Sequence, residues 1–350
     1  MLPKVYIIIL NWNGWKDTIE CLESIQKTLY SNYSLIVIDN CSNDTSVEKI
    51  ESWAAGELPV ESPFVSYDAS LKPVSILEYD KVTAELGGNN EKEESHACIA
   101  SCKKMILIQA GANLGFAGGN NIGIRYAMAR NDFDYLWILN NDTVIKPDSL
   151  NELVLRMQIK PGTGICGSTI LYYDKPECVQ AYGGFTYNRW FGISKQLGNL
   201  ERYNSTIDAC TIEKKMDGVQ GASMFVSKEF ITEIGLLSEE YFMYFEEQDW
   251  VARSNGRYSI AYTPASIVYH KEGSTIGSSS RFLKKPYQAD YYSLRNRIIF
   301  TKRYYPYALA TVKIGLLLAI VNRIRRRQWD RIPLILKMIF CVITSGKYKR

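Results

Sequence analysis

The stretch Val5-Tyr-Ile-Ile-Ile-Leu-Asn-Trp-Asn13 decides the fold class of this chain. Its first six residues are continuously apolar and mostly β-branched, which is typical of a strand buried on both faces of a parallel sheet. Polar residues follow at once, and residues 15–29 then place Ile19, Leu22 and Ile25 on one helical face. We therefore predict a buried strand followed directly by a helix.

The same alternation continues through the first half of the chain. Further strands are predicted at residues 35–38, 105–109 and 135–139, and further helices at 47–53, 120–130 and from Pro147 onward. Strands that alternate with helices over short turns predict an α/β fold, Rossmann-like and doubly wound around a mostly parallel sheet.

Two stretches interrupt this alternation within a catalytic domain that we place at residues 1–285. Residues 56–104 are polar, acidic and interrupted by prolines, so we predict an insertion with a small hairpin around residues 74–77. Residues 172–216 are rich in aromatic, glycine and polar residues, which favours a β-rich excursion that faces the substrate.

The C-terminal segment has a composition of its own. Residues 281–350 contain 17 Lys or Arg and two acids, whereas the rest of the chain carries 24 basic and 35 acidic residues. The apolar runs 307–321 and 334–344 are each shorter than the roughly 20 residues that span a bilayer. We predict that residues 286–350 form a basic, apolar helical tail on an anionic membrane surface, at the cytoplasmic side. Packing of the tail on protein is the alternative.

Cysteine and histidine usage excludes some site classes. None of the eight cysteines belongs to a CxxC pair, and the chain has two histidines. This pattern does not fit a zinc site of the usual ligand spacing. Free thiols in a chain of this size fit a reducing compartment. The first apolar run is too short for a signal peptide, so we expect a cytoplasmic protein.

Polar residues gather where the predicted strands end. These residues are Asn11 to Asn13, Asp39 to Asp44, Asn113 to Asn120, and Asn140 to Asp142. In open α/β sheets, ligands bind beyond the carboxyl ends of the strands, so we predict a ligand site here. Ordinary turn chemistry is the alternative for each segment alone, because Asn, Asp, Gly and Ser are turn residues.

The residue types at this edge fit a nucleotide and a cation. The Asp39 carboxylate can accept hydrogen bonds from a nucleobase or a ribose hydroxyl. Gly115 and Gly118 would let backbone amides approach a ligand at a helix start, where anions are favoured. Asp142 offers the oxygen ligand that hard divalent cations prefer. A helix-capping or turn role is the alternative for both carboxylates.

A second acidic group follows an aromatic cluster. Residues 241–245 are Tyr-Phe-Met-Tyr-Phe, and Glu246, Glu247 and Asp249 come directly after them. Acids beside apolar surface are where a pKa rises and a general base sits. A surface turn in which Asp249 opens a helix is the alternative. His270 follows a predicted short strand and is either a core histidine or a ligand.

Together these motifs resemble family 2 inverting glycosyltransferases of the GT-A fold, and most closely their rhamnosyltransferase-like branch. The likeness covers about residues 3–305, except for the two stretches 56–104 and 172–216. It rests on Leu10 to Asn13, Val37 to Asp44, Asn113 to Asn121, Leu139 to Asp142, Glu246 to Trp250, and His270. The chain departs from the family twice. Asn140 replaces the first acid of the metal motif, and Glu246-Glu247 replaces the usual Glu-Asp pair.

The resemblance implies an activity and a role for each site residue. It implies transfer of a sugar, with inversion, from a nucleotide diphosphate donor to a hydroxyl of a growing cell-surface glycan, on a lipid-linked or polysaccharide acceptor. By resemblance, Glu247 is the catalytic base, and Asp142 and His270 hold Mg²⁺ or Mn²⁺. The implied donor-binding residues are Asn11, Asn13, Asp39, Asn113, Gly115, Gly118, Asn120, Asn141 and Asp249.

Several alternatives stay open at this point. For the donor, we favour dTDP-rhamnose, with UDP-linked hexoses second. A sugar-phosphate nucleotidyltransferase would need a glycine-rich basic loop after the first strand, and a dinucleotide oxidoreductase would need GxGxxG there; Asn11 to Trp15 offers neither. A non-catalytic membrane-bound scaffold is disfavoured by the acids at 142, 247 and 249. We expect no nucleic-acid partner, and the oligomeric state stays open.

Overall fold

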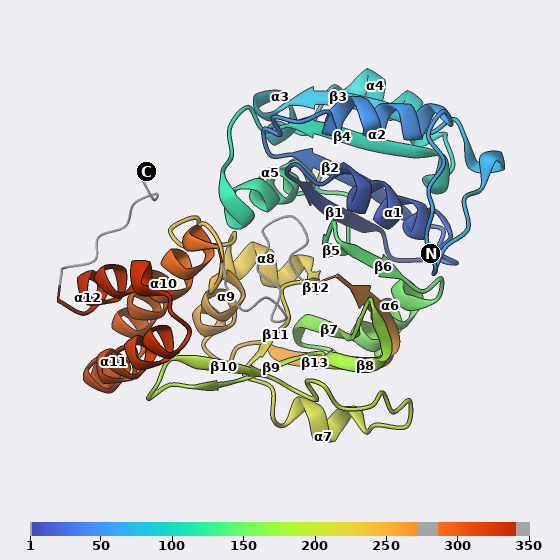
Figure 1. The fold of residues 1–350 in the computed structure, drawn as a ribbon. Coiled ribbons are helices and arrows are strands. Elements are labelled where there is room, and N and C mark those ends of the chain that lie inside the picture. The colour runs from blue at the N-terminus through green and yellow to red at the C-terminus, as the bar shows by residue number, and fades with distance from the viewer. Residues whose placement is uncertain (1, 272–285, 341–350) are drawn as a thin grey trace.

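A ten-stranded sheet forms the centre of the structure, a computed structural model that describes residues 2–271 and 286–340 (Figure 1). Its strands are β1 (Val5–Asn11), β2 (Tyr33–Asp39), β3 (Ser75–Asp80), β4 (Lys104–Gln109), β5 (Tyr135–Asn140), β6 (Thr143–Ile145), β7 (Thr163–Tyr172), β8 (Lys175–Tyr182), β12 (Ser223–Ser227) and β13 (Ser259–His270). Their order is β3-β4-β2-β1-β5-β12-β7-β13-β6, and β8 pairs with β7. The first five strands run parallel, whereas β12 is antiparallel to both its neighbours. The predicted α/β class is confirmed.

Helices cover both faces of the sheet because successive strand residues point to opposite faces. Ile7 and Ile9 of β1 belong to one apolar core, and Tyr6 and Ile8 belong to the other. The first core is completed by α1 (Trp15–Gln26), α2 (Ser46–Ala55) and α6 (Ser149–Ile159), and the second by α5 (Gly115–Arg130), α8 (Lys228–Ile234) and α9 (Glu246–Ser254). This two-sided burial explains the continuous apolar run of β1.

The predicted insertion 56–104 contributes a strand to the central sheet. The hairpin predicted around residues 74–77 is wrong, because β3 pairs in parallel with β4 and forms the sheet edge. Of the β3 residues, Tyr79 alone is fully buried, so no apolar run marks the strand in the sequence. The other elements of this segment are η1 (Ala69–Leu71), α3 (Lys81–Glu85), α4 (Asn90–Ala97) and η2 (Ser101–Lys103).

The excursion at residues 172–216 is β-rich, as predicted. A small second sheet has the order β10-β9-β11 and lies beside the central sheet (Figure 1). Besides β8, the elements here are β9 (Gly184–Asn188), β10 (Ile193–Gln196), α7 (Ala209–Glu213) and β11 (Gly218–Val219).

The described part of the tail is helical, as predicted. Its elements are α10 (Tyr287–Tyr304), η3 (Pro306–Ala308), α11 (Leu309–Arg325), η4 (Trp329–Arg331) and α12 (Ile332–Phe340). The three helices share an apolar core, and α10 also packs on residues 241 and 245 through Phe300. Residues 306–325 form a helix of 20 residues that is long and apolar enough, by length and composition, to cross a membrane. This helix is longer than the apolar run 307–321 on which the prediction of a short segment is based.

Candidate functional site

Hydrogen bonds connect the carboxyl ends of three strands. Asn11 and Asp39 end β1 and β2 in register, and Asn11 Nδ2 donates to Asp39 Oδ1 at 2.9 Å. Thr18 Oγ1 donates to Asn11 Oδ1 at 2.8 Å and accepts from Asn141 Nδ2 at 3.0 Å. Three of the predicted donor-binding residues therefore belong to one network. Thr18, the first-turn residue of α1 that joins them, belongs to no motif that marks it in the sequence.

Asp39 is held firmly by its own loop. Its carboxylate is 2% exposed, and it accepts from Ser42 N at 2.9 Å and from Ser42 Oγ at 2.6 Å. Asn13 N–H donates to the same Ser42 Oγ at 2.9 Å, and Asn13 Oδ1 accepts from Asn43 N–H at 2.8 Å. The loops after β1 and β2 are thus tied together. The nucleoside contacts of Asp39 and Asn13 stay predictions.

At the start of α5, the first backbone amides donate hydrogen bonds to other groups of the protein. Gly115 N–H donates to Asn113 Oδ1 at 2.9 Å, and Phe116 N–H donates to Phe242 O at 2.6 Å. Gly115 has a φ of +73°, and a Cβ there would lie 2.3 Å from Phe242 O. The Gly115 amide is bonded within the protein, and the glycine lets the segment 241–245 pack closely on the helix. A donor contact of Gly115 stays a prediction.

Two further α5 residues have contacts inside the protein. A Cβ at Gly118 would lie 2.7 Å from Leu114 Cβ, so this glycine permits close packing, and its donor contact stays a prediction. Asn120 Nδ2 donates to Phe116 O at 2.9 Å, while its buried Oδ1 has no hydrogen-bond partner. A donor contact of Asn120 stays a prediction.

The two predicted metal residues come together in the fold. His270 Nε2 lies 3.2 Å from Asp142 Oδ1, and both side chains are buried. They meet because β6 pairs antiparallel with β13, which sets His270 opposite Thr143. The strand that ends at His270 has 12 residues, so the prediction of a short strand is wrong.

A third residue orients the His270 ring. Gln180 Oε1 lies 2.7 Å from His270 Nδ1. Because an amide oxygen only accepts, Nδ1 carries a proton in this arrangement, and the Nε2 face is turned to Asp142. At this distance, His270 Nε2 and the Asp142 carboxylate either share a proton or bind the same cation. Orientation of a histidine by a second polar group is usual at metal sites.

The donor set at this point fits a divalent cation that also binds substrate. Within residues 2–271 and 286–340, no group of three or more His, Cys, Asp and Glu is arranged to hold a metal. Mg²⁺ and its relatives are usually bound by one or two carboxylates, substrate phosphates and water. Asp142 with His270 therefore suits a cation that a diphosphate completes. Gln180 lies in the excursion, and no motif marks it in the sequence.

The backbone before α9 is strained. Phe242, Tyr244 and Phe245 have φ values of +67°, +67° and +78°. Bulky residues rarely adopt this left-handed region, and such strain is concentrated at functional sites. Because α9 begins directly afterwards, the strained segment sets the direction in which the side chains of Glu246 and Glu247 point.

Glu247 lies at the same sheet edge as Asp142. A Cβ at Gly221 would lie 3.7 Å from Glu247 Oε1, and the next residue, Ala222, accepts from Asn140 N–H at 3.0 Å. Desolvation raises the pKa of Glu247 to about 7. This half-buried carboxylate can therefore accept a proton near neutral pH.

The Asp249 side chain lies buried between α9 and α10. Its buried carboxylate accepts from Tyr241 Oη at 3.1 Å, Tyr304 Oη at 2.7 Å, Arg253 Nε at 2.7 Å and Arg303 Nη1 at 3.2 Å. Protein groups therefore bond both carboxylate oxygens and connect α9 to α10. A donor contact of Asp249 stays a prediction.

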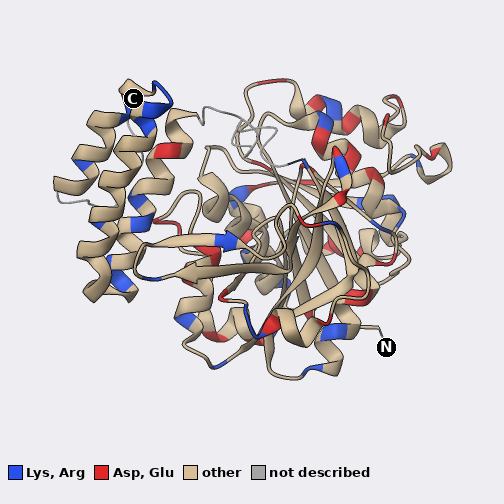
Figure 2. Ribbon diagram, turned by 60° about the horizontal axis from the view of Figure 1, so that its bottom comes forward, with Lys and Arg blue, Asp and Glu red and all other residues tan. Residues whose placement is uncertain are grey.

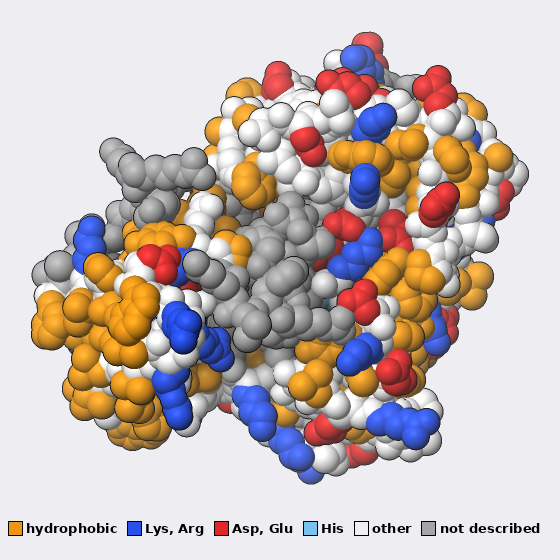
Figure 3. All heavy atoms as spheres, in the orientation of Figure 1, with side chains coloured by type: hydrophobic (Ala, Val, Ile, Leu, Met, Phe, Trp, Pro, Cys, Tyr) orange, Lys and Arg blue, Asp and Glu red, His pale blue; other side chains and the backbone are white. Residues whose placement is uncertain are grey.

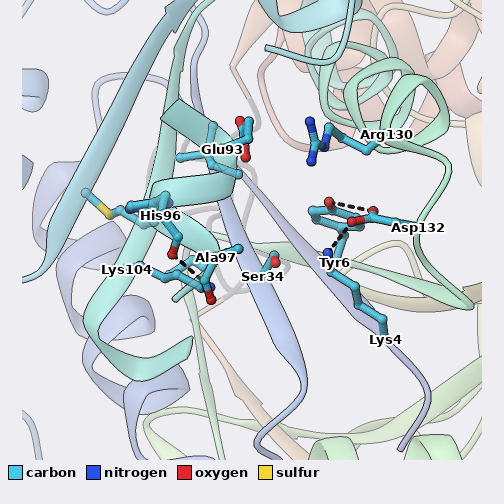
Figure 4. Close-up of a pocket in the computed structure, with 12 residues that line it drawn as sticks. Lys4, Tyr6, Ser34, Glu93, His96, Ala97, Lys104, Arg130 and Asp132 are labelled. Atoms are coloured by element: carbon cyan, nitrogen blue, oxygen red, sulfur yellow. Dashed lines mark hydrogen bonds and ion pairs between the residues drawn. The ribbon is translucent and has the colours of Figure 1, made fainter. Parts of the chain in front are cut away.

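A separate pocket opens at the opposite, amino edge of the sheet (Figure 4). Several of its charged groups are bonded within the protein. Lys4 Nζ donates to Asp132 Oδ2 at 2.5 Å, and Lys104 Nζ donates to the carbonyl of His96 at 3.2 Å, near the end of α4. These interactions give the polar residues that line the pocket a structural role. The pocket shares no residue with the site at the carboxyl ends of the strands.

Comparisons with known proteins show the family and the fold. The family model described as glycosyl transferase family 2 matches residues 6–66 and 89–225. A hexosyltransferase of low-salt glycan biosynthesis from Haloferax volcanii is 28% identical over 192 residues, which are 55% of this chain and 58% of that protein. The chain thus spans little more than half the length of this relative.

Two solved structures have a similar fold. A mannosyltransferase from Pyrobaculum calidifontis in complex with GDP-Man and Mn²⁺ has a TM-score of 0.51 and 14% identity, over 97% of this chain and 86% of that one. GalNAc-T7 with UDP, GalNAc and Mn²⁺ has a TM-score of 0.53 and 15% identity, over 97% and 58%. At these identities the likeness concerns the fold alone.

Proposed function

The chain belongs to glycosyl transferase family 2. We propose that it is a glycosyltransferase that moves a sugar from a nucleotide-sugar donor onto an acceptor hydroxyl, with inversion. One observation carries this proposal. Glu247, a carboxylate whose pKa is raised to about 7, lies at the strand edge that also holds the Asp142–His270 pair. A base and a cation site at one edge are the two groups that a single displacement at a sugar phosphate needs.

In the proposed reaction, Glu247 accepts the proton of the acceptor hydroxyl as that oxygen attacks the anomeric carbon. The bond to the nucleoside diphosphate breaks on the opposite face, so the anomeric configuration inverts. Asp142 and His270 would hold Mg²⁺ or Mn²⁺, which offsets negative charge on the departing diphosphate. The network of Asn11, Asp39 and Asn141 supports a nucleoside-binding role for this edge.

For the donor we propose dTDP-rhamnose, on the basis of the motif resemblance. UDP-linked hexoses are the second candidate, favoured by the likeness to a hexosyltransferase. The proposed acceptor is a lipid-linked or polysaccharide chain of a growing cell-surface glycan.

Donor hydrolysis by the purified chain tests activity and donor together. We expect Mg²⁺- or Mn²⁺-stimulated release of dTDP from dTDP-rhamnose, and less release of UDP from UDP-glucose. Saturable turnover of UDP-glucose with none of dTDP-rhamnose would reject the proposed donor. A chain that hydrolyses neither but forms dTDP-rhamnose from dTTP and rhamnose 1-phosphate would be a nucleotidyltransferase. A chain inactive in all these assays would be a scaffold.

We also propose that the tail holds the enzyme on the cytoplasmic face of the membrane. Exposed apolar residues of α11 include Ile314, Leu318 and Val321, at 57%, 61% and 51% exposure. Hydrophobic side chains gather over the tail helices in Figure 3, and Lys and Arg outnumber Asp and Glu on them in Figure 2. Each such cation contributes about 1 kcal/mol near an acidic membrane surface.

The β9–β10 hairpin extends this apolar surface. Trp190 at its tip is 52% exposed, and its ring centroid lies 5.3 Å from that of Tyr307. Thr311 Oγ1 donates to Trp190 O at 2.6 Å, which fixes the hairpin to the tail. Tryptophan and tyrosine are enriched at the membrane–water interface, so the joint surface suits an interfacial position.

Sedimentation with vesicles tests the membrane proposal on the full chain. Binding to phosphatidylglycerol vesicles at low salt should exceed binding to phosphatidylcholine vesicles and should weaken in high salt. Leu318→Asp should reduce binding, whereas Leu155→Asp, at an exposed position of α6, should not. A chain that ignores anionic vesicles at low salt overturns the proposal. Attachment that resists high salt and alkaline washing would indicate a spanning helix and reject a peripheral position.

A further inference from the structure

A buried polar pair on α10, Arg295 and Asn296, faces the strained segment 241–245 that leads into α9. We propose that Asn296 is a positioning residue for catalysis, which holds this segment in the conformation that presents Glu247 to the acceptor. The proposal rests on the proposed role of Glu247 as the base. It makes α10 part of the catalytic site, although the sequence places the helix in the tail.

Asn296 bonds the segment through three carbonyl groups. Its side chain is fully buried, and Nδ2 donates to Tyr241 O at 2.8 Å, Met243 O at 2.7 Å and Tyr244 O at 3.0 Å. An amide NH₂ has two hydrogens, so at least one of them is shared between two of these carbonyls. One side chain, 52 to 55 residues further along the chain, thus bonds three of the four carbonyl groups of residues 241–244, just before Glu247.

Arg295 sets the direction in which the Asn296 amide points. Its Nη1 donates to Asn296 Oδ1 at 2.6 Å and to Glu240 O at 3.0 Å. With the oxygen engaged by the guanidinium, the NH₂ group must face the segment. Arg295 is 1% exposed, and its Nε and Nη2 have no hydrogen-bond partner. A buried cation with unused donors is costly for stability, so stability alone does not explain the pair.

The segment 241–245 must be stabilised by contacts with the rest of the protein, because its own backbone conformation is unfavourable. Phe242, Tyr244 and Phe245 lie in the left-handed region, and such conformations persist only where the surroundings enforce them. Tyr292 of α10 adds an apolar contact, with its ring stacked on Phe242 at 4.8 Å between centroids. The ring restrains one side chain, whereas Asn296 restrains the peptide groups whose orientation sets the start of α9.

The test uses Asn296→Ala, which removes the donors, and Asn296→Asp, which keeps the volume but cannot donate when ionised. A misplacement of about 1 Å costs on the order of 100-fold in rate, so both variants should lose about 100-fold in kcat. KM for the donor should stay unchanged, because the nucleoside edge is untouched. Leu294→Ala is the matched control, since Leu294 is buried among the tail helices and belongs to a different apolar cluster.

A double variant separates positioning from general destabilisation. If Asn296 acts through Glu247, then Asn296→Ala should cost little further activity in a Glu247→Gln background. Equal losses in both backgrounds, or an equal loss in Leu294→Ala at matched melting temperature, would overturn the proposal. Wild-type kcat in Asn296→Ala would overturn it as well. Full activity of Glu247→Gln alone would instead reject the assigned base, so the two failures are distinguishable.

Discussion

Replacement of Glu247 by Gln probes the proposed chemistry most directly. The substitution keeps the size of a side chain that lies against Gly221 and removes its ability to accept a proton. Loss of a general base costs roughly 100- to 10,000-fold in rate, which is about 3–5 kcal/mol of transition-state stabilisation. Binding of the nucleoside diphosphate should be retained, because the Asn11–Asp39 network does not involve Glu247.

The raised pKa of Glu247 also predicts how the turnover rate depends on pH. Desolvation places the pKa of Glu247 at about 7, so at pH 6 about one tenth of the carboxyl is ionised. Wild-type turnover should therefore fall about tenfold per pH unit below 7 and level off above it. The ionised form is the one that burial disfavours, so Glu247→Gln should raise the melting temperature above pH 7. That gain should vanish near pH 4.5, where the unfolded chain also becomes protonated.

The assay is donor turnover from pH 5 to 9, with Glu246→Gln as the matched control. Burial, and then the charge of Glu247, raise the pKa of Glu246 well above its usual range, so Gln replaces a carboxyl group whose ionisation is disfavoured. Glu246→Gln should retain the wild-type turnover rate and the decrease of that rate below pH 7. An inactive Glu246→Gln beside an active Glu247→Gln would refute the reasoning and move the base by one residue.

Other substitutions test the cation site and the contact between helices. Asp142→Asn should abolish stimulation by Mn²⁺ while the melting temperature stays near wild type; full wild-type activity in excess chelator would contradict a metal role. Gln180→Ala should weaken Mn²⁺ affinity about 10- to 100-fold, with activity recovered at high Mn²⁺, because the His270 ring loses its orientation; an unchanged Mn²⁺ titration would count against this. Asp249→Asn should lower the free energy of unfolding by about 3 kcal/mol, measured in urea, since a buried carboxylate with two arginine partners loses its charge; an unchanged midpoint would refute its structural role.

Much of the fold follows from short-range pattern. The apolar run at residues 5–10 required burial on both faces, and the polar residues directly after it had to lie at the sheet edge where parallel strands end. The same reasoning brought Asp39 and Asp142 to that edge, and the structure places both there. The parallel pairing of β3 with the central sheet escaped prediction, because an edge strand that is half exposed carries no continuous apolar run.

The sequence by itself determined the sheet, the family and the chemistry available at the strand ends, since these depend on local periodicity and on residue type. Tertiary structure alone decided which groups those residues meet. Gly115 packs under Phe242, Asp249 ties α9 to α10, and Gln180 and Asn296 reach the site from distant segments. Such contacts join residues 50 or more positions apart, and a hydrogen bond across that separation imposes no periodicity on the sequence around either partner.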